Sequence, residues 1–201
     1  DIRGDLIRHF QSLGFILHSE TTIWKDPVVQ MQRTKAHGLL YKNLRLDASK
    51  VRQGMADYLI TMLKPGESKI KVTHNPEGFT LDMWQNYASP VWMDIQQSNT
   101  LNRSGAKEQG DERHICPLQL EVIERAVNLW TNPGEVVYSP FMGIGSEGYI
   151  SVKMGRRFVG SELKPSYFKM AKQNLAVAKE DMQDLFSYHD IDTVCEGVEE
   201  S

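Results

Sequence analysis

The segment VVYSPFMGIGSEGYI, residues 136–150, most constrains the fold, because it has the pattern of a strand, a glycine-rich turn and the start of a helix. Gly143, Gly145 and Gly148 match G-x-G-x-x-G, and Glu162 follows 19 residues after the first glycine, at the end of the next expected strand. Such glycines, with a helix N-terminus, hold a phosphate or ribose, and the carboxylate accepts hydrogen bonds from ribose hydroxyls. The pattern predicts a site for a nucleotide-like cofactor.

The position of this segment limits which cofactor fits. A dinucleotide needs a second mononucleotide-binding half, but only 39 residues follow Glu162, so the rest of the fold must precede the loop. Phe141, directly before the glycines, is placed to form one wall of an adenosine pocket. An NAD(P)-dependent oxidoreductase fragment stays open as an alternative, because Glu162 alone would permit it.

Regular elements are expected on both sides of an irregular middle. The spacing of apolar residues predicts a helix over 5–13, which Gly14 ends, and strands over 15–24 and 56–66 that pair antiparallel. Residues 77–113 predict a small insertion or loop module. The second half predicts a βαβ unit with a preceding helix: helix 117–130, strand 136–138, a helix to about 154, strand 156–163 and helix 165–179.

Composition indicates an ordinary intracellular protein with one sizeable core. The chain has 201 residues, 40% of them apolar, and no apolar run long enough to cross a membrane. Its two cysteines, Cys116 and Cys195, lie far apart and have no zinc-ligand spacing, so neither a disulfide framework nor a metal site is expected.

Charge is distributed unevenly along the chain. Residues 1–75 carry 12 Lys or Arg against 7 Asp or Glu, although the whole chain has a net charge of -3. Seven of these basic residues lie in 25–54, which we call the basic segment. An anionic partner is therefore expected to bind there. No Lys or Arg follows Lys179, and 180–201 is expected to be a polar, acidic tail.

Several stretches resemble the β-class DNA amino-methyltransferases, which transfer a methyl group to an exocyclic amino nitrogen of adenine or cytosine. GEVVYSPFMGIGSEG, GRRFVGSEL and RHICPLQLEVIERAV resemble the cofactor half of that class, and IWKDPV, YASPVWMDI and RHICPLQL are most similar to phage-type DNA methylases. In this class the catalytic half comes first, then a target-recognition insertion, then the S-adenosylmethionine-binding half. That order explains why the glycine loop comes late.

The resemblance implies an α/β, Rossmann-like S-adenosylmethionine-dependent methyltransferase fold with permuted motif order, incomplete at its N-terminus and carrying a small target-recognition insertion. Its expected parts are the end of the catalytic half (1–76, including the basic segment), the insertion (77–113), the S-adenosylmethionine-binding half (114–179) and the acidic tail (180–201).

The resemblance also implies roles for individual residues. Phe141, Gly143 and Gly145 would shape the pocket around the methionine and ribose, and Glu162 would hold the ribose hydroxyls. His114 and Cys116 match the His and Thr of a His-Pro-Thr-Gln-Lys-Pro motif, whereas Pro117 replaces its Gln and Ser139 replaces the usual Asp. The implied cofactor residues are His114, Cys116, Ser139, Pro140, Phe141, Gly143, Gly145, Ser146 and Glu162.

Double-stranded DNA is the implied macromolecular partner. Lys35, Lys42 and Arg45 in the basic segment are expected to contact phosphates, and Trp92 in the insertion is expected to contact bases. The class holds the target nitrogen with a Pro-Pro-aromatic loop, but this chain contains no Pro-Pro, so its catalytic residues are expected in an N-terminal segment upstream of residue 1.

Other readings stay open at this point. A non-catalytic DNA-binding subunit that supplies specificity to a partner is a further alternative. The sequence does not choose between adenine and cytosine, and it leaves the target site and the oligomeric state open. The expected location is the cytoplasm of a bacterial or phage-infected cell.

Overall fold

The computed structural model describes residues 1–102 and 117–195, with side chains described as far as Met182. The chain divides into two compact units, Asp1–Ile95 and Gln96–Ser201. No helix in the described part has the length and apolar character needed to cross a membrane.

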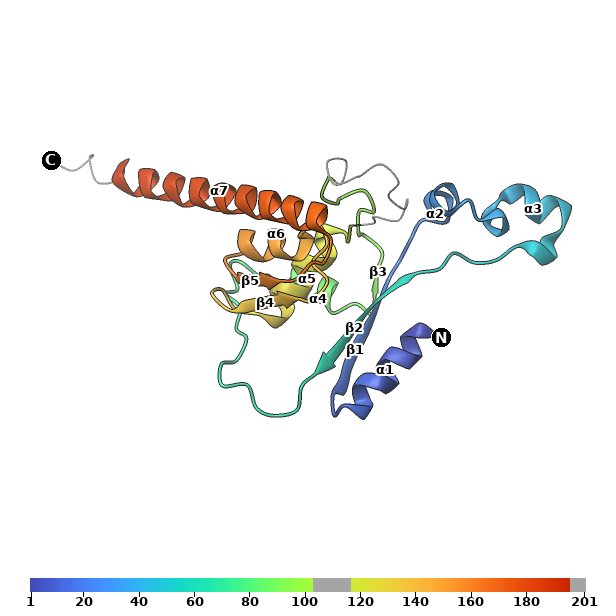
Figure 1. The fold of residues 1–201 in the computed structure, drawn as a ribbon, viewed down its shortest axis with the longest axis horizontal. Helices are drawn as coiled ribbons and strands as arrows, with labels where there is room; N and C mark the ends of the chain where they lie inside the picture. The colour runs from blue at the N-terminus through green and yellow to red at the C-terminus, as the bar shows by residue number, and fades with distance from the viewer. Residues whose placement is uncertain (103–116, 196–201) are drawn as a thin grey trace. The chain divides into compact units, whose positions relative to one another are not determined.

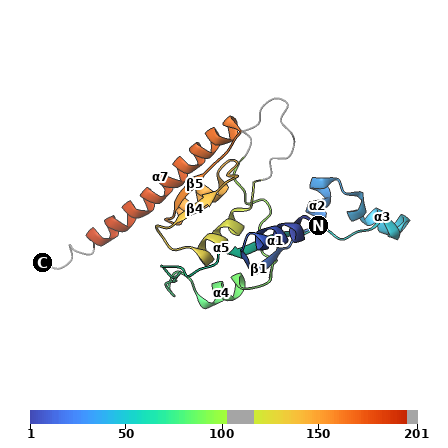
Figure 2. The same ribbon diagram turned by 60° about the horizontal axis from the view of Figure 1, so that its bottom comes forward.

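The N-terminal unit is built on a three-stranded sheet. Helix α1 (Ile2–Ser12) ends before Gly14, whose φ of +91° suits glycine, and Figure 2 shows α1 alongside strand β1. Strand β1 (Ile16–Ile23) pairs antiparallel with β2 (Asp57–Leu63), which confirms the predicted antiparallel pairing. The sheet order is β2-β1-β3, because the short strand β3 (Val91–Trp92) pairs parallel with β1.

Part of the predicted insertion therefore belongs to this sheet. Helix α4 (Leu81–Tyr87) begins after Thr80, whose side chain accepts a hydrogen bond from the Met83 amide, and it leads directly into β3. The boundary between the compact units falls after Ile95, not at the edges of 77–113.

The basic segment contains short helices that its sequence does not predict. These are α2 (Pro27–Thr34), η1 (His37–Leu39), α3 (Tyr41–Leu46) and η2 (Ala48–Lys50). Asp26 caps α2 by accepting hydrogen bonds from the Val28 and Val29 amides, at 2.7 and 3.0 Å. Each helix is too short to show a sustained period of 3.6 residues, which explains why the sequence does not predict these helices.

The C-terminal unit confirms the predicted βαβ arrangement. Helix α5 (Leu120–Trp130) precedes strand β4 (Val136–Ser139), helix α6 (Ser146–Lys153), strand β5 (Arg157–Gly160) and helix α7 (Pro165–Cys195). The strands β4 and β5 are parallel. Figure 1 shows α6 lying between α7 and this strand pair, in agreement with its contacts to both.

A compact apolar cluster holds α5 and α6 against the strands. Ile123, Val127 and Ile150 form its buried centre, with Val137 among the residues packed around it. Buried Arg156 joins the start of β5 to the end of α5, because its guanidinium donates to the hydroxyl and carbonyl oxygens of Thr131 at 3.0 and 2.7 Å. This framework fixes where β4 and β5 end.

Helix α7 is longer than the sequence predicted. The expected helix stopped near Lys179, with a tail beyond it, but α7 continues to Cys195. After Pro165 the next glycine or proline is Gly197, so no helix-breaking residue interrupts this stretch, and acidic composition alone does not end a helix.

Candidate functional site

The glycine loop joins β4 to α6 and uses left-handed backbone at two positions. Gly143 has φ +54° and Gly145, the N-cap of α6, has φ +86°. A side chain at either position is strained. The two glycines differ in their surroundings, however: a Cβ at Gly143 would have no atom within 4 Å, whereas a Cβ at Gly145 would lie 3.1 Å from that of Ala171. A Cβ would therefore meet open space at Gly143 but not at Gly145.

Packing explains the remaining glycine of the motif. A Cβ at Gly148 would approach Phe158 to 2.6 Å and Leu175 to 2.7 Å, so glycine here lets α6 lie close to β5 and α7. Of the three motif glycines, Gly145 and Gly148 thus serve helix packing, and Gly143 faces open space.

Glu162 lies directly beside the loop. Its Oε2 accepts a hydrogen bond from the Gly143 amide at 3.0 Å, and its Oε1 accepts one from the Lys164 amide at 2.9 Å. A carboxylate has about four acceptor positions, so each oxygen keeps one for a further donor. Two hydroxyl groups on neighbouring carbons fit such a pair of acceptors.

Ser161 connects the loop to the end of β5 through three further hydrogen bonds. Its amide donates to the Ser139 carbonyl at 3.0 Å, its carbonyl accepts from the Met142 amide at 3.0 Å, and its hydroxyl donates to the Pro140 carbonyl at 2.9 Å. These hydrogen bonds tie the loop to the end of β5. The sequence motif did not single out Ser161.

Two large apolar side chains are exposed beside the loop. Phe141 is 87% exposed and Leu163, immediately after Glu162, is 100% exposed. Exposed apolar side chains next to polar binding groups are typical of a ligand site. The sequence motif predicts Phe141 but not Leu163, whose signal is an apolar residue directly after the strand-end acid, followed by Lys164 and Pro165.

The other predicted cofactor residues have different positions. Ser139 and Ser146 are buried, and Pro140 is exposed. His114 and Cys116 lie outside the described residues.

A partly buried carboxyl group occupies the first turn of α6. Burial raises the pKa of Glu147 above its ordinary value of 4.5. The charged form is therefore less favourable in the folded protein than in the unfolded chain.

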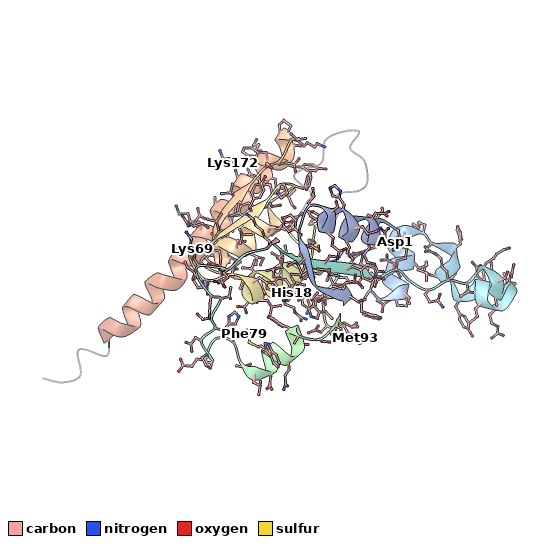
Figure 3. All side chains as sticks on the ribbon, turned by 90° about the horizontal axis from the view of Figure 1, so that it is seen from below. Asp1, His18, Lys69, Phe79, Met93 and Lys172 are labelled. Atoms are coloured by element: carbon pink, nitrogen blue, oxygen red, sulfur yellow. The ribbon has the colours of Figure 1, made fainter. Side chains whose placement is uncertain are left out.

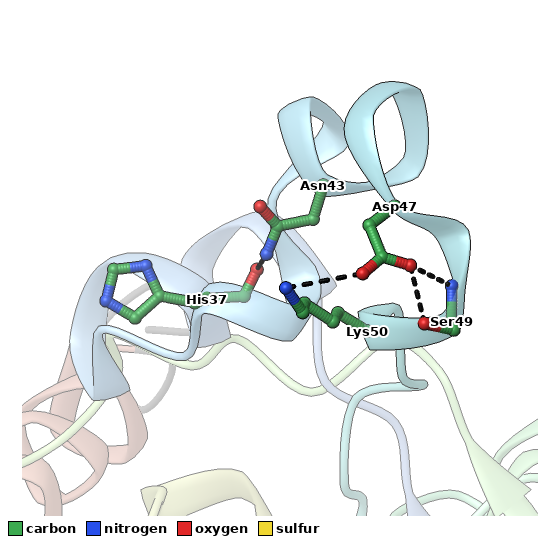
Figure 4. Close-up of polar contacts among 5 residues, drawn as sticks. All are labelled: His37, Asn43, Asp47, Ser49 and Lys50. Carbon is green, nitrogen blue, oxygen red and sulfur yellow. Dashed lines mark hydrogen bonds and ion pairs between the residues drawn. The ribbon is translucent and has the colours of Figure 1, made fainter.

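The basic segment has a different character from the loop. Lys35, Lys42 and Arg45 are all exposed, and Lys35 ends α2 with left-handed backbone at φ +55°. Figure 4 shows the contacts that shape the segment: Asn43 donates to the His37 carbonyl, and Asp47 accepts from Ser49 and pairs with Lys50. The hydrogen bond from the Ser49 hydroxyl, followed by the contact with Lys50, lowers the pKa of Asp47.

The structure contradicts the predicted role of Trp92. Its side chain is 1% exposed, and its indole nitrogen donates to the Tyr87 carbonyl at 3.2 Å. A ring that is buried in the protein is not available to stack on a base, so Trp92 is a core residue. Trp84, on α4, is 52% exposed, and Met93, labelled in Figure 3, is 66% exposed.

The fold and loop define a class. A parallel βαβ unit with a glycine loop after its first strand and an acid after its second is a Rossmann-like arrangement for a nucleotide-containing cofactor. The family model of N6_N4_Mtase, described as DNA methylase, matches residues 3–173, and the chain belongs to this family.

Individual relatives agree with this assignment. The chain is 30% identical over 79 residues to the putative methylase YubD and 33% identical over 67 residues to the DNA adenine methyltransferase YhdJ, both of Escherichia coli (strain K12). These matches cover 39% and 33% of this chain, and 35% and 23% of the relatives.

A solved structure supports the fold. A putative DNA modification methylase from Thermus thermophilus, complexed with S-adenosyl-L-methionine, superimposes with a TM-score of 0.61 at 21% identity. The match covers 89% of this chain and 60% of that chain, so our chain spans less than two thirds of its length. The predicted α/β, Rossmann-like methyltransferase fold is confirmed.

Proposed function

We propose that this chain is the cofactor-binding and DNA-contacting part of an S-adenosylmethionine-dependent DNA amino-methyltransferase, which methylates the exocyclic amino nitrogen of adenine or cytosine. The observation that carries the proposal is the open, left-handed turn at Gly143, whose amide is hydrogen-bonded to the Glu162 carboxylate. Such a turn lets a ligand approach the backbone, and the neighbouring acid can accept hydrogen bonds from the hydroxyl groups of its ribose.

The described residues fit S-adenosylmethionine. Gly143 would leave room for the ligand, Glu162 would accept hydrogen bonds from the two ribose hydroxyls, and Phe141 with Leu163 would offer apolar surface to the adenine. Ser139, Pro140, Gly145 and Ser146 shape the loop that frames them, and His114 and Cys116 are proposed neighbours of the amino-acid end. When bound, the cofactor supplies an electrophilic methyl group on a sulfonium sulfur.

The basic segment is proposed to hold double-stranded DNA. Lys35, Lys42 and Arg45 would neutralise phosphates and position the duplex, while base recognition falls to other residues. Binding of this kind is salt-dependent and requires no particular sequence. An enzyme of a bacterium or phage that acts on DNA in this way works in the cytoplasm.

We place the catalytic residues in a preceding segment of the same protein. The motif that holds the target nitrogen contains Pro-Pro, which this chain lacks. The strand pair has one face covered by α6, whereas Val136, Tyr138 and Val159 are exposed on the other. Parallel sheets are normally covered on both faces, so another part of the protein is expected to pack there.

A labelled-methyl transfer assay tests the proposal. Residues 1–201, given S-adenosylmethionine and DNA of mixed sequence, should show no methyl incorporation above background, because they hold the cofactor without holding the base. A longer chain that restores the preceding segment should transfer methyl groups. Robust turnover by residues 1–201 alone would contradict the proposed division, and no turnover by the longer chain would favour a non-catalytic DNA-binding subunit.

A further inference from the structure

A side chain from α7 reaches back to the centre of the glycine loop. The amide nitrogen Nδ2 of Asn174 donates a hydrogen bond of 2.8 Å to the carbonyl oxygen of Ile144. Ile144 stands between the two left-handed glycines and is only 4% exposed. The family model ends at residue 173, so Asn174 lies just beyond the residues that it matches.

The other polar contacts of the loop leave a place for this bond. The amides of Met142, Gly143 and Gly145 donate to Ser161, to Glu162 and to the Met142 carbonyl respectively. None of these three donors serves the Ile144 carbonyl, and a buried carbonyl without a donor is costly. Asn174 supplies that donor.

The same face of α7 also packs against the loop. Ala171, three residues before Asn174 and fully buried, has its Cβ 3.1 Å from the position that a Cβ on Gly145 would take. Residues three apart share a helix face, so α7 contacts the loop with a small apolar group and an amide donor side by side. The small group allows the close approach that the amide needs.

From this geometry we infer that Asn174 is a positioning residue for the cofactor loop. It acts through the Ile144 carbonyl and fixes the peptide units on either side, including the Gly143 turn that faces open space. This inference rests on the proposed function only for the identity of the ligand. A loop ordered beforehand binds more tightly because no ordering cost is left for the ligand to meet.

Three variants separate positioning from simple stabilisation. Asn174→Leu has similar size without a donor, Asn174→Asp replaces the donor with an acceptor, and Asn174→Gln keeps the amide on a longer side chain. Ala178→Gly is the control, because Ala178 is buried on the same helix one turn further along. It weakens the helix and leaves the Asn174 amide in place.

Hydrogen exchange of the ligand-free 201-residue chain is the first measurement. In Asn174→Leu and Asn174→Asp, the Gly143 and Gly145 amides should exchange roughly two- to tenfold faster than in the wild type, as expected for loss of one hydrogen bond. Asn174→Gln should recover part of the protection. Ala178→Gly should leave the ratio of loop exchange to core exchange unchanged. Unchanged loop exchange in both Asn174→Leu and Asn174→Asp would overturn the inference.

Titration with S-adenosylmethionine is the second measurement. Asn174→Leu should bind the cofactor several-fold more weakly than Ala178→Gly, with each variant measured at the same interval below its own melting temperature. Equal affinities would overturn the positioning role. If the wild-type chain binds no S-adenosylmethionine, the proposed function fails, but the exchange result still decides whether Asn174 orders the loop.

Discussion

The glycine loop and the basic segment are both rich in polar contacts, but the side-chain hydrogen bonds that shape the loop reach further along the chain than those of Figure 4. Loop residues bond to Glu162, Ser161 and Asn174, which lie 19 to 30 residues away. Within the basic segment, the side-chain hydrogen bonds shown in Figure 4 join residues only two to six positions apart.

This difference suits two kinds of ligand. Contacts between distant residues on strands and helices hold a loop rigidly, as a small cofactor with fixed geometry requires. Local contacts keep a surface segment folded with little connection to a core, and such segments open and adjust at low cost. We therefore expect substitutions in the loop to affect stability and cofactor binding, and substitutions in the basic segment to affect DNA binding alone.

The largest effect is expected at Gly145. Gly145→Val forces a β-branched residue into left-handed backbone and against Ala171, so the free energy of unfolding should fall by about 2–5 kcal/mol in urea denaturation. Gly134→Val is the control, because φ there is +80° with no atom within 4 Å. It should lose only about 1–2 kcal/mol. Equal losses would show that the contact with α7 is unimportant.

The next largest effect is expected for Glu162→Gln, which should weaken the binding of S-adenosylmethionine. A neutral amide can no longer accept from both backbone amides and from two hydroxyls, so calorimetry should show S-adenosylmethionine affinity lowered by about 1.5–3 kcal/mol. Glu121→Gln is matched to it, since Glu121 also accepts from a backbone amide, that of Gln96, and from the side chain of Asn99. Unchanged affinity in Glu162→Gln would place the ribose elsewhere.

Replacing Lys35, Lys42 and Arg45 together by Ala should weaken DNA binding without changing the thermal stability. All three side chains are exposed, and the slope of log affinity against log salt should fall by roughly 1–3 for up to three lost phosphate contacts. The matched control replaces three exposed lysines of α7, Lys169, Lys172 and Lys179, of which Figure 3 labels Lys172. An equal loss of DNA affinity in both variants would show that only the net charge of the protein matters, not the position of these three residues.

The smallest effect is a pH dependence at Glu147. Because burial raises its pKa in the folded state, the charged carboxylate costs stability at neutral pH, and this cost disappears below the ordinary pKa of 4.5. Glu147→Gln should therefore raise the melting temperature at pH 7 but not at pH 4. Glu124→Gln, at an exposed position on α5, should change neither value. A gain that persists at pH 4 would assign the effect to packing.

The sequence predicted the elements whose pattern is long and local. The antiparallel pair of β1 and β2, the helix α5 and the β4–α6–β5 unit follow from apolar periodicity and from the glycines and prolines that end these elements. The motif also predicted that Glu162 belongs with Gly143. The motif does not predict that Gly145 serves packing whereas Gly143 faces open space, because Ala171, which packs against Gly145, lies on a helix distant in sequence.

Burial explains the clearest error. The sequence places Trp92 in an insertion and predicts base contact for it, but the pairing of Val91 and Trp92 with β1 brings its side chain into the core. A two-residue strand leaves no period in the sequence. The sequence does not predict the role of Asn174 for a related reason, because an asparagine inside a helix forms no pattern that reveals a partner 30 residues away.

Calorimetric titration of S-adenosylmethionine into the wild type, Gly143→Ala and Gly134→Ala tests most directly whether the loop is a preformed cofactor site. Both variants place alanine in left-handed backbone with open space around it, so their strain is comparable, but only Gly143 faces the proposed ligand. We predict similar binding by the wild type and Gly134→Ala, and binding at least about tenfold weaker by Gly143→Ala, a difference of about 1.4 kcal/mol. Equal affinity in all three proteins, or binding of NAD in place of S-adenosylmethionine, would contradict the account.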